Sequence, residues 1–234
     1  MSGTSADGVD VSLIKTDGEY FFSAIDSLRL EYNAEEKRTI INNPIKNLNK
    51  VNNLVTSKHI EAIEMLLEKN IIKKSKIFCI GLHGQTIFHA PHLGWSWQLC
   101  NAKQIAKYFS IKVISDLRLR DINLGGQGAP LVPLVDESLI GRLNGWRGIL
   151  NLGGIANLTI IPPKSGFEKK SFCMGWDCGP ANSLIDLAIE ETSNLLLRFD
   201  ENGDLASMGT PKMNVIEEWL KEPFFQQEPP RSTG

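Results

Sequence analysis

Near its start the chain reads Gly3-Thr4-Ser5-Ala6-Asp7-Gly8-Val9-Asp10, and apolar residues follow at Val11, Leu13 and Ile14. Glycines and hydroxyls let backbone and side-chain donors approach phosphate oxygens, while carboxylates such as those of Asp7 and Asp10 are ligands that magnesium accepts. An ordinary polar hairpin turn is the competing interpretation, because short glycine motifs also arise by chance. We favour a phosphate-binding turn that leads into a strand.

The rest of the chain alternates between strand-like and helix-like segments, which indicates an α/β protein. Apolar and β-branched runs predict strands at residues 9–15, 21–30, 77–82, 111–115, 148–152 and 155–161. Apolar residues at helical spacing predict helices at residues 57–70, 102–109, 131–143, 182–192 and 214–221. Ser57 and Asn182 are the expected N-caps of two of these helices. Hairpin turns are expected at Thr16-Asp17-Gly18 and Gly153-Gly154.

A strand pair at a turn rich in glycine or hydroxyl residues occurs twice, first near residue 3 and again near residue 153. We therefore expect two lobes, residues 1–145 and 146–234, with a nucleotide cleft between them. The loop over residues 175–182 is bounded by glycines and precedes a helix.

Composition excludes several classes of partner. Lys and Arg number 25 against 27 Asp and Glu, so the net charge of −2 gives no reason to expect nucleic acid or an anionic membrane. No apolar run reaches the roughly 18 residues that a membrane-spanning helix requires. The four cysteines lack the spacing of a zinc site, and they fit a reducing cytoplasm. The sequence therefore predicts a cytoplasmic protein that acts on a small molecule.

Three further sites carry candidate functional residues. His83-Gly84-Gln85-Thr86 predicts a polar loop that contacts a sugar or the scaffold rather than a metal. The end of the predicted strand over residues 111–115 carries Asp116, Arg118, Arg120 and Asp121. This is where α/β sheets place ligands, although a structural salt-bridge network competes with that interpretation. Asp177, in the glycine-bounded loop, is a candidate general base, and a capping role is the alternative. Cys178 is a weaker candidate, as a nucleophile.

Six motifs resemble one family when they are taken in chain order. They read GTSADGVD, GLHGQT, SDLRLRD, GGQGAPLVP, NLGGIANLT and GWDCGPANSLID, and they run from residue 3 to residue 186. This series is similar to that of the bacterial anhydro-N-acetylmuramic acid kinases. The resemblance implies the two-lobed actin, hexokinase and Hsp70-like fold, which is ribonuclease H-like. It also implies that the family extends beyond both ends of this sequence, so that the second lobe is incomplete.

The resemblance further implies an activity, an ATP-dependent phosphotransfer in peptidoglycan recycling. Water opens the 1,6-anhydro ring of anhydro-N-acetylmuramic acid, and O6 receives the γ-phosphate, which gives N-acetylmuramic acid 6-phosphate. A non-catalytic remnant with weak sugar binding, or a kinase for another sugar, are the alternatives. For the full-length protein the resemblance is compatible with a homodimer.

Site residues follow from the same resemblance. Asp177 matches the aspartate that activates water, and Arg118 matches an arginine of the sugar site, where His83, Gln85 and Asp116 are also expected. The expected ATP phosphate loop comprises Gly3, Thr4, Ser5, Ala6, Asp7, Gly8, Val9 and Asp10. Mg²⁺ would offset the charge of the phosphates, with Asp7 as its expected protein ligand.

Overall fold

A computed structural model describes residues 2, 6–19, 21–42 and 44–233. These residues form two compact units, the first ending at Gly128 and the second running from Ala129 to Thr233. The division lies earlier than the boundary expected near residue 145, because the helix α5 (Pro133–Ile140) packs on the strand β8 (Ile155–Ile161) of the second unit. Thr159 on β8 fixes this contact by donating a hydrogen bond of 2.7 Å to Asp136 on α5.

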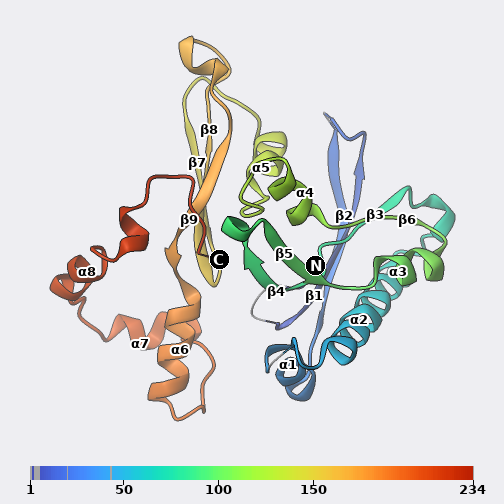
Figure 1. Ribbon diagram of the computed structural model, residues 1–234, viewed down its shortest axis with the longest axis horizontal. Helices are drawn as coiled ribbons and strands as arrows, with labels where there is room; N and C mark the ends of the chain where they lie inside the picture. Colours follow the sequence, from blue (N-terminus) through green and yellow to red (C-terminus); the bar gives the residue numbers. More distant parts are fainter. Residues whose placement is uncertain (1, 3–5, 20, 43, 234) are drawn as a thin grey trace. The chain divides into compact units, whose positions relative to one another are not determined.

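The first unit combines strands with helices, and α2 (Leu48–Lys69) is the longest of the helices that the structure describes there (Figure 1). Its strands are β1 (Gly8–Thr16), β2 (Phe22–Glu31), β3 (Cys79–Gly81), β4 (Gln85–Ala90), β5 (Trp95–Leu99) and β6 (Lys112–Ile114). Its α-helices are α1 (Ala34–Ile41), α2 (Leu48–Lys69), α3 (Ala102–Phe109) and α4 (Leu117–Asn123), with 3-10 turns η1 (Lys74–Lys76) and η2 (Pro91–Leu93).

The antiparallel pair β1–β2 confirms the first predicted hairpin, and Gly18 turns the chain with a φ of 87°. β3 and β6 pair in parallel, as expected, with α3 before β6. A second hairpin, β4–β5, lies between β3 and β6 in the sequence, and this hairpin was not predicted. Ser2 connects the two hairpins, because it bridges Val9 of β1 and Gln85 of β4.

The long helix α2 supplies much of the core of the first unit. Its apolar side chains pack on β1 and β2 at one end and on α3 at the other. The core residues that share these contacts are Val9, Ile40, Val51, Val55, Ala62, Leu67, Leu99, Ile105 and Phe109. The predicted helix started at Ser57, and this start is wrong: Ser57 lies inside α2 and donates its hydroxyl hydrogen bond to Leu54 O at 2.9 Å.

An antiparallel sheet in the order β7-β8-β9 is the centre of the second unit (Figure 1). Its other strands are β7 (Arg147–Leu152) and β9 (Met174–Pro180). Its other helices are α6 (Asn182–Thr192), α7 (Asp204–Ser207) and α8 (Met213–Trp219), with 3-10 turns η3 (Phe167–Lys170), η4 (Glu201–Gly203) and η5 (Pro223–Gln226). The β7–β8 hairpin and α6 confirm the predictions made for this region.

Two predictions in the second unit are wrong. Residues 175–180 are not a loop, because they belong to β9, which pairs with β8 over its length. Asn182 is not the cap of α6: that helix has Ala181 at the N-cap position, and the Asn182 amide instead donates to Leu152 O at 3.1 Å.

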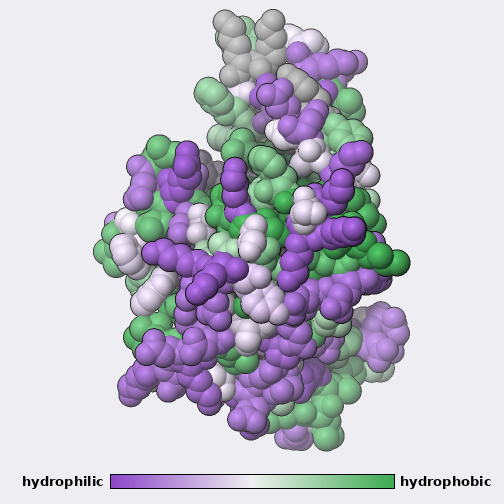
Figure 2. Space-filling model, turned by 90° about the vertical axis from the view of Figure 1, so that its right-hand side faces the viewer, coloured by the Kyte–Doolittle hydropathy of each residue, from purple (hydrophilic) through white to green (hydrophobic). Residues whose placement is uncertain are grey.

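The surface carries many apolar side chains. Figure 2 shows hydrophobic and hydrophilic residues next to one another on the face that it presents. Among the described residues, no helix combines the length and the apolar character that crossing a bilayer requires.

Candidate functional site

The described part of the predicted phosphate loop begins at Ala6, because Gly3, Thr4 and Ser5 lie outside the described residues. Ala6 is buried and has a φ of 50°, a left-handed conformation that non-glycine residues adopt infrequently. Tyr32 donates its backbone N–H to Asp7 O at 2.9 Å, and Val9 is fully buried in the core. Ser2 pairs with Val9 in an antiparallel bridge, and Ala6 takes a left-handed conformation between them, at the place where a phosphate-binding turn was expected.

Cations surround the carboxylate of Asp7. Lys37 Nζ lies 2.6 Å from Oδ1, and Arg29 Nη2 lies 3.8 Å from Oδ2. Arg29 also lies 3.9 Å from the Asp10 carboxylate. A magnesium ion bound at Asp7 would meet these positive charges, so the arrangement does not fit the predicted metal ligand. Among the described residues, no group of three or more His, Cys, Asp or Glu side chains is arranged to hold a metal ion.

Arg118, on α4, is held by two hydrogen bonds within the first unit. Its Nε donates to His83 Nε2 at 2.8 Å, and its Nη1 donates to Gly128 O at 2.8 Å. The side chain is half-buried. Two bonds from different edges of a planar guanidinium fix both its position and the orientation of its plane. The structure thus brings together two of the residues predicted for the sugar site, His83 and Arg118.

Both ring nitrogens of His83 have partners inside the protein. Nδ1 lies 2.9 Å from Gly84 O, and since a carbonyl oxygen only accepts, the proton belongs on Nδ1. Nε2 then carries no proton, and its lone pair accepts the hydrogen bond from Arg118 Nε. Burial, and to a smaller extent the charge of Arg118, lowers the pKa of His83. The imidazole is therefore neutral at pH 7.

A glycine-rich loop supplies the other acceptor for Arg118. Gly128 ends this loop with a φ of 68°, and its N–H donates to Asp121 Oδ2 at 2.7 Å. A Cβ at Gly128 would lie 2.9 Å from Ile122 Cδ1 and 3.0 Å from Arg118 O, so glycine is required there. Asp121 was predicted from the sequence to lie at the same ligand site as Arg118, whereas Gly128 was given no role there. The signal in the sequence that points to Gly128 is the position of the Asp121 carboxylate, one helical turn before the glycine-rich loop.

The other two residues predicted for the sugar site lie in different environments. Gln85 is only 2% exposed, accepts a hydrogen bond from Ser2 Oγ and donates to Thr86 O at 3.3 Å. Its sugar contact stays a prediction, and its burial favours a structural role. Asp116 is exposed, and its Oδ2 accepts from Ser115 Oγ at 3.0 Å. It lines a cavity of about 340 Å³ together with Ser115, Leu119, Arg120, Asn123 and Leu124.

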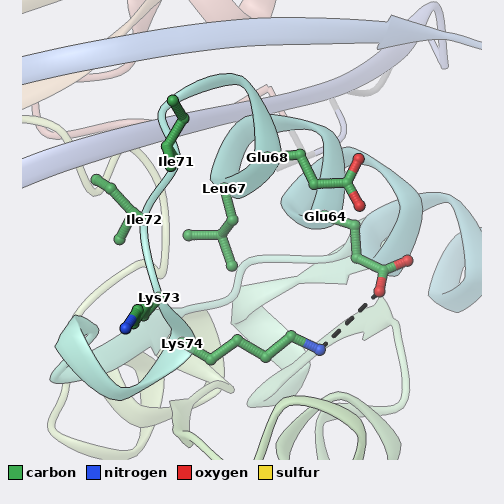
Figure 3. Close-up of a pocket in the computed structure, with 7 residues that line it drawn as sticks. All are labelled: Glu64, Leu67, Glu68, Ile71, Ile72, Lys73 and Lys74. Atoms are coloured by element: carbon green, nitrogen blue, oxygen red, sulfur yellow. Dashed lines mark ion pairs between the residues drawn. The ribbon is translucent and has the colours of Figure 1, made fainter.

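A larger hollow of about 400 Å³ lies elsewhere in the first unit (Figure 3). It is lined by Glu64, Leu67, Glu68, Ile71, Ile72, Lys73 and Lys74, at the end of α2 and the segment that follows it. Lys74 Nζ lies 4.0 Å from Glu64 Oε1 and rests over the rings of Tyr108 and Phe109. None of the predicted site residues lines this hollow, and Lys74 already pairs with Glu64, so we assign it no part in the site.

Asp177 is the candidate base of the second unit, and it lies on β9 with only 7% of its surface exposed. Its Oδ2 accepts three hydrogen bonds, from Thr233 N at 2.8 Å, Thr233 Oγ1 at 3.2 Å and Ser232 Oγ at 3.2 Å. No residue that the structure describes donates a hydrogen bond to Oδ1. One oxygen of the carboxylate is therefore anchored, while the other is available to a solvent molecule or a ligand.

Residues 231–233 lie alongside Asp177 through backbone contacts as well. Asp177 N donates to Arg231 O at 2.9 Å, and Arg231 Nε donates to Asp177 O at 3.3 Å. Nη1 of the same arginine donates to Gln227 O at 2.6 Å. Ser232 and Thr233 were not predicted from the sequence as partners of the base.

The neighbours of Asp177 on β9 have structural explanations. Gly179 has a φ of 145°, and a Cβ there would lie 2.9 Å from the Phe225 ring. Burial raises the pKa of the Cys178 thiol, which disfavours the thiolate that a nucleophile requires. Of these residues of β9, Asp177 is the one whose surroundings suit a general base.

Comparison with known proteins gives a consistent result over the whole chain. The family model described as anhydro-N-acetylmuramic acid kinase matches residues 1–234. A protein of that name from Prochlorococcus marinus (strain NATL1A) is 47% identical over 243 residues. Proteins of the same name from Prochlorococcus marinus (strain MIT 9313) and Synechococcus sp. (strain CC9311) are 46% and 42% identical. Each match covers 100% of this chain, and the chain spans 64% of the length of each of these relatives.

Proposed function

The chain belongs to the anhydro-N-acetylmuramic acid kinase family, and from that premise we propose that it is an ATP-dependent kinase for 1,6-anhydro-N-acetylmuramic acid. We further infer that its two compact units correspond to the lobes of an actin, hexokinase and Hsp70-like fold. ATP is the proposed phosphoryl donor, and the cytoplasm, where ATP is available, is the proposed location.

The proposed reaction couples ring opening to phosphoryl transfer. A water molecule attacks C1 of the sugar and gives one proton to Asp177, and the C1–O6 bond breaks. O6 forms a bond to the γ-phosphorus of ATP while the bond from that phosphorus to the leaving oxygen of ADP breaks. The products are N-acetylmuramic acid 6-phosphate, ADP and the proton that Asp177 releases to solvent.

The anchored carboxylate of Asp177 is the observation that carries this proposal. A general base must reach the proton that it removes and must hold its orientation while it does so. Three donors fix Oδ2, and Oδ1 has no donor among the described residues. A side chain that only capped a helix would show the opposite arrangement, with donors from the first turn of α6, and the bonds to Ser232 and Thr233 do not fit that role.

Arg118 and residues 3–10 receive the other proposed roles. The oriented guanidinium of Arg118 suits an oxygen-rich, anionic sugar, because a planar group with several donors recognises carboxylates and hydroxyls in a defined geometry. Residues 3–10 are proposed to contact the phosphates of ATP. We assign no residue to magnesium, since Lys37 and Arg29 already pair with Asp7.

An isotope experiment tests the proposed chemistry directly. The purified chain is incubated with ATP, Mg²⁺ and anhydro-N-acetylmuramic acid in ¹⁸O-water, and the products are analysed by mass spectrometry. We expect sugar-dependent release of ADP and one ¹⁸O atom at C1 of the sugar phosphate, with none in the phosphoryl group. Label in free phosphate would show ATP hydrolysis instead, and turnover of another hexose but not of the anhydro-sugar would show a different sugar kinase.

A further inference from the structure

His83 and Arg118 form a contact that the proposed reaction does not yet use. The two residues are 35 positions apart, and Arg118 Nε donates to His83 Nε2 at 2.8 Å. His83 lies between β3 and β4, while Arg118 lies in the first turn of α4. The imidazole thus connects the strand region of the first unit to the helix that carries the arginine.

The hydrogen-bond directions along this connection are fixed by chemistry. A guanidinium N–H only donates, so Nε2 of His83 must be the acceptor and must carry no proton. Gly84 O only accepts, so Nδ1 must carry the proton. Gly84 O also accepts from Ser2 N at 3.2 Å, which holds the acceptor of His83 in place. Only one tautomer satisfies both bonds, and it presents its lone pair to Arg118.

We propose that His83 is a positioning residue, whose Nε2 accepts from Arg118 Nε and orients the guanidinium group for the sugar. This inference rests on the function proposed above for Arg118. It replaces the expectation that His83 contacts the sugar itself, because both of its ring nitrogens are committed inside the protein. Gly128 O fixes the other edge of the guanidinium, so His83 and Gly128 together set its plane.

Two substitutions separate the two bonds of His83. In His83→Gln the amide oxygen reaches the position of Nε2 and continues to accept from Arg118. In His83→Asn the shorter amide reaches only the position of Nδ1, so it keeps the bond to Gly84 O and loses the one to Arg118. A residue with a purely structural role through Gly84 would tolerate Asn better than Gln, whereas a positioning residue requires the reverse order.

Sugar kinetics of the 234-residue chain provide the first test. We expect His83→Asn to raise KM for anhydro-N-acetylmuramic acid about tenfold, the size expected for one lost hydrogen bond to a charged group. kcat should change less than KM, and His83→Gln should restore most of the loss. In an Arg118→Ala background, His83→Asn should have no further effect on KM. Equal defects in the two variants, or the same KM increase in the Arg118→Ala background, would overturn the proposal.

A spectroscopic readout keeps the proposal testable apart from turnover. Nitrogen-15 NMR of the imidazole is expected to show Nδ1 protonated and Nε2 unprotonated at pH 7, and Arg118→Ala should shift the Nε2 signal of His83. Protonation on Nε2 would overturn the inference even in an active enzyme. If the chain does not turn over the anhydro-sugar, the proposed function fails, while the NMR result still decides whether His83 orients Arg118.

Discussion

Thr233 donates two hydrogen bonds to one oxygen of Asp177, from its backbone N–H at 2.8 Å and from Oγ1 at 3.2 Å. Both donors converge on Oδ2 from a residue that is 56 positions further along the chain. A buried carboxylate without partners is costly, and these donors offset that cost while they orient the group. The proposed base therefore depends on a segment whose sequence gives no obvious sign of it.

The hydroxyl of Thr233 provides the first prediction. Thr233→Val removes the Oγ1 donor but keeps the backbone donor and the side-chain shape, so we expect kcat to fall about tenfold, at the lower end for a bond to a charged group. Thr233→Ser keeps the hydroxyl and should retain most of the turnover. Steady-state kinetics with the anhydro-sugar check this, and equal kcat values for the two variants would show that Oγ1 does not orient the base.

Replacement of the base itself is the second prediction. Asp177→Asn removes the proton acceptor without changing the volume of the side chain, so turnover should fall by about a hundredfold or more. ATP binding, measured by calorimetry, should stay close to that of the unmodified chain. Glu191→Gln on α6 is the matched control, because Glu191 is an exposed carboxylate of the same unit, and it should leave turnover unchanged. Loss of ATP binding in Asp177→Asn would argue against the water-activating role.

The contrast between two hairpin regions shows what local sequence predicts. The β1–β2 pair was predicted because two strand-like runs flank a turn at Thr16-Asp17-Gly18, and both signals are local. β9 was missed because its glycines, its aspartate and its proline are poor strand formers. Pairing with β8 imposes the extended conformation on β9. A local sequence pattern cannot predict a partner that is 20 residues away, such as Asn157 opposite Asp177.

The candidate site divides in the same way. Arg118, His83 and Asp177 were predicted as site residues from their chemical type and their position after predicted strands or in loops. Their roles were inferred from the resemblance to a family. Their partners were not predictable, because the contacts of Arg118 with His83 and of Asp177 with Thr233 join residues 35 and 56 positions apart. Asp7 was predicted as a metal ligand because it shares a glycine- and hydroxyl-rich turn with a second carboxylate, that of Asp10. The cations that pair with Asp7 come from β2 and α1, which the turn itself does not reveal.

Gly128 provides the third prediction, which concerns stability. Gly128→Ala places a Cβ 2.9 Å from Ile122 in a residue whose φ is 68°, so it adds a steric clash to an unfavourable backbone conformation. We expect the free energy of unfolding of the first unit to fall by about 2 kcal/mol or more in urea titrations. Gly18→Ala is the control, because its φ is 87° but no atom lies within 4 Å of the added Cβ. Equal losses in the two variants would show that the contact with Ile122 has no cost.

The fourth prediction concerns the pH dependence of stability and involves His59 on α2. His59 is 1% exposed, its Nδ1 donates to Val55 O at 2.7 Å, and its Nε2 has no partner among the described residues. Burial lowers the pKa of His59 from its ordinary 6.5 to about 4. Between these two pH values the unfolded chain binds a proton that the folded chain does not, so the free energy of unfolding must decrease as the pH falls.

Urea titrations from pH 7 to pH 4 measure this effect, which amounts to about 3 kcal/mol over the window for a shift of this size. The pKa of Asp26, lowered to about 2 by Lys69 and Asn70, adds its own contribution only at more acidic pH. His59→Leu should remove most of the dependence of the unfolding free energy on pH. The lowered pKa of the buried His83 should leave a smaller dependence in the same direction. An unchanged pH dependence in His59→Leu would mean that this imidazole is not held neutral by burial in α2.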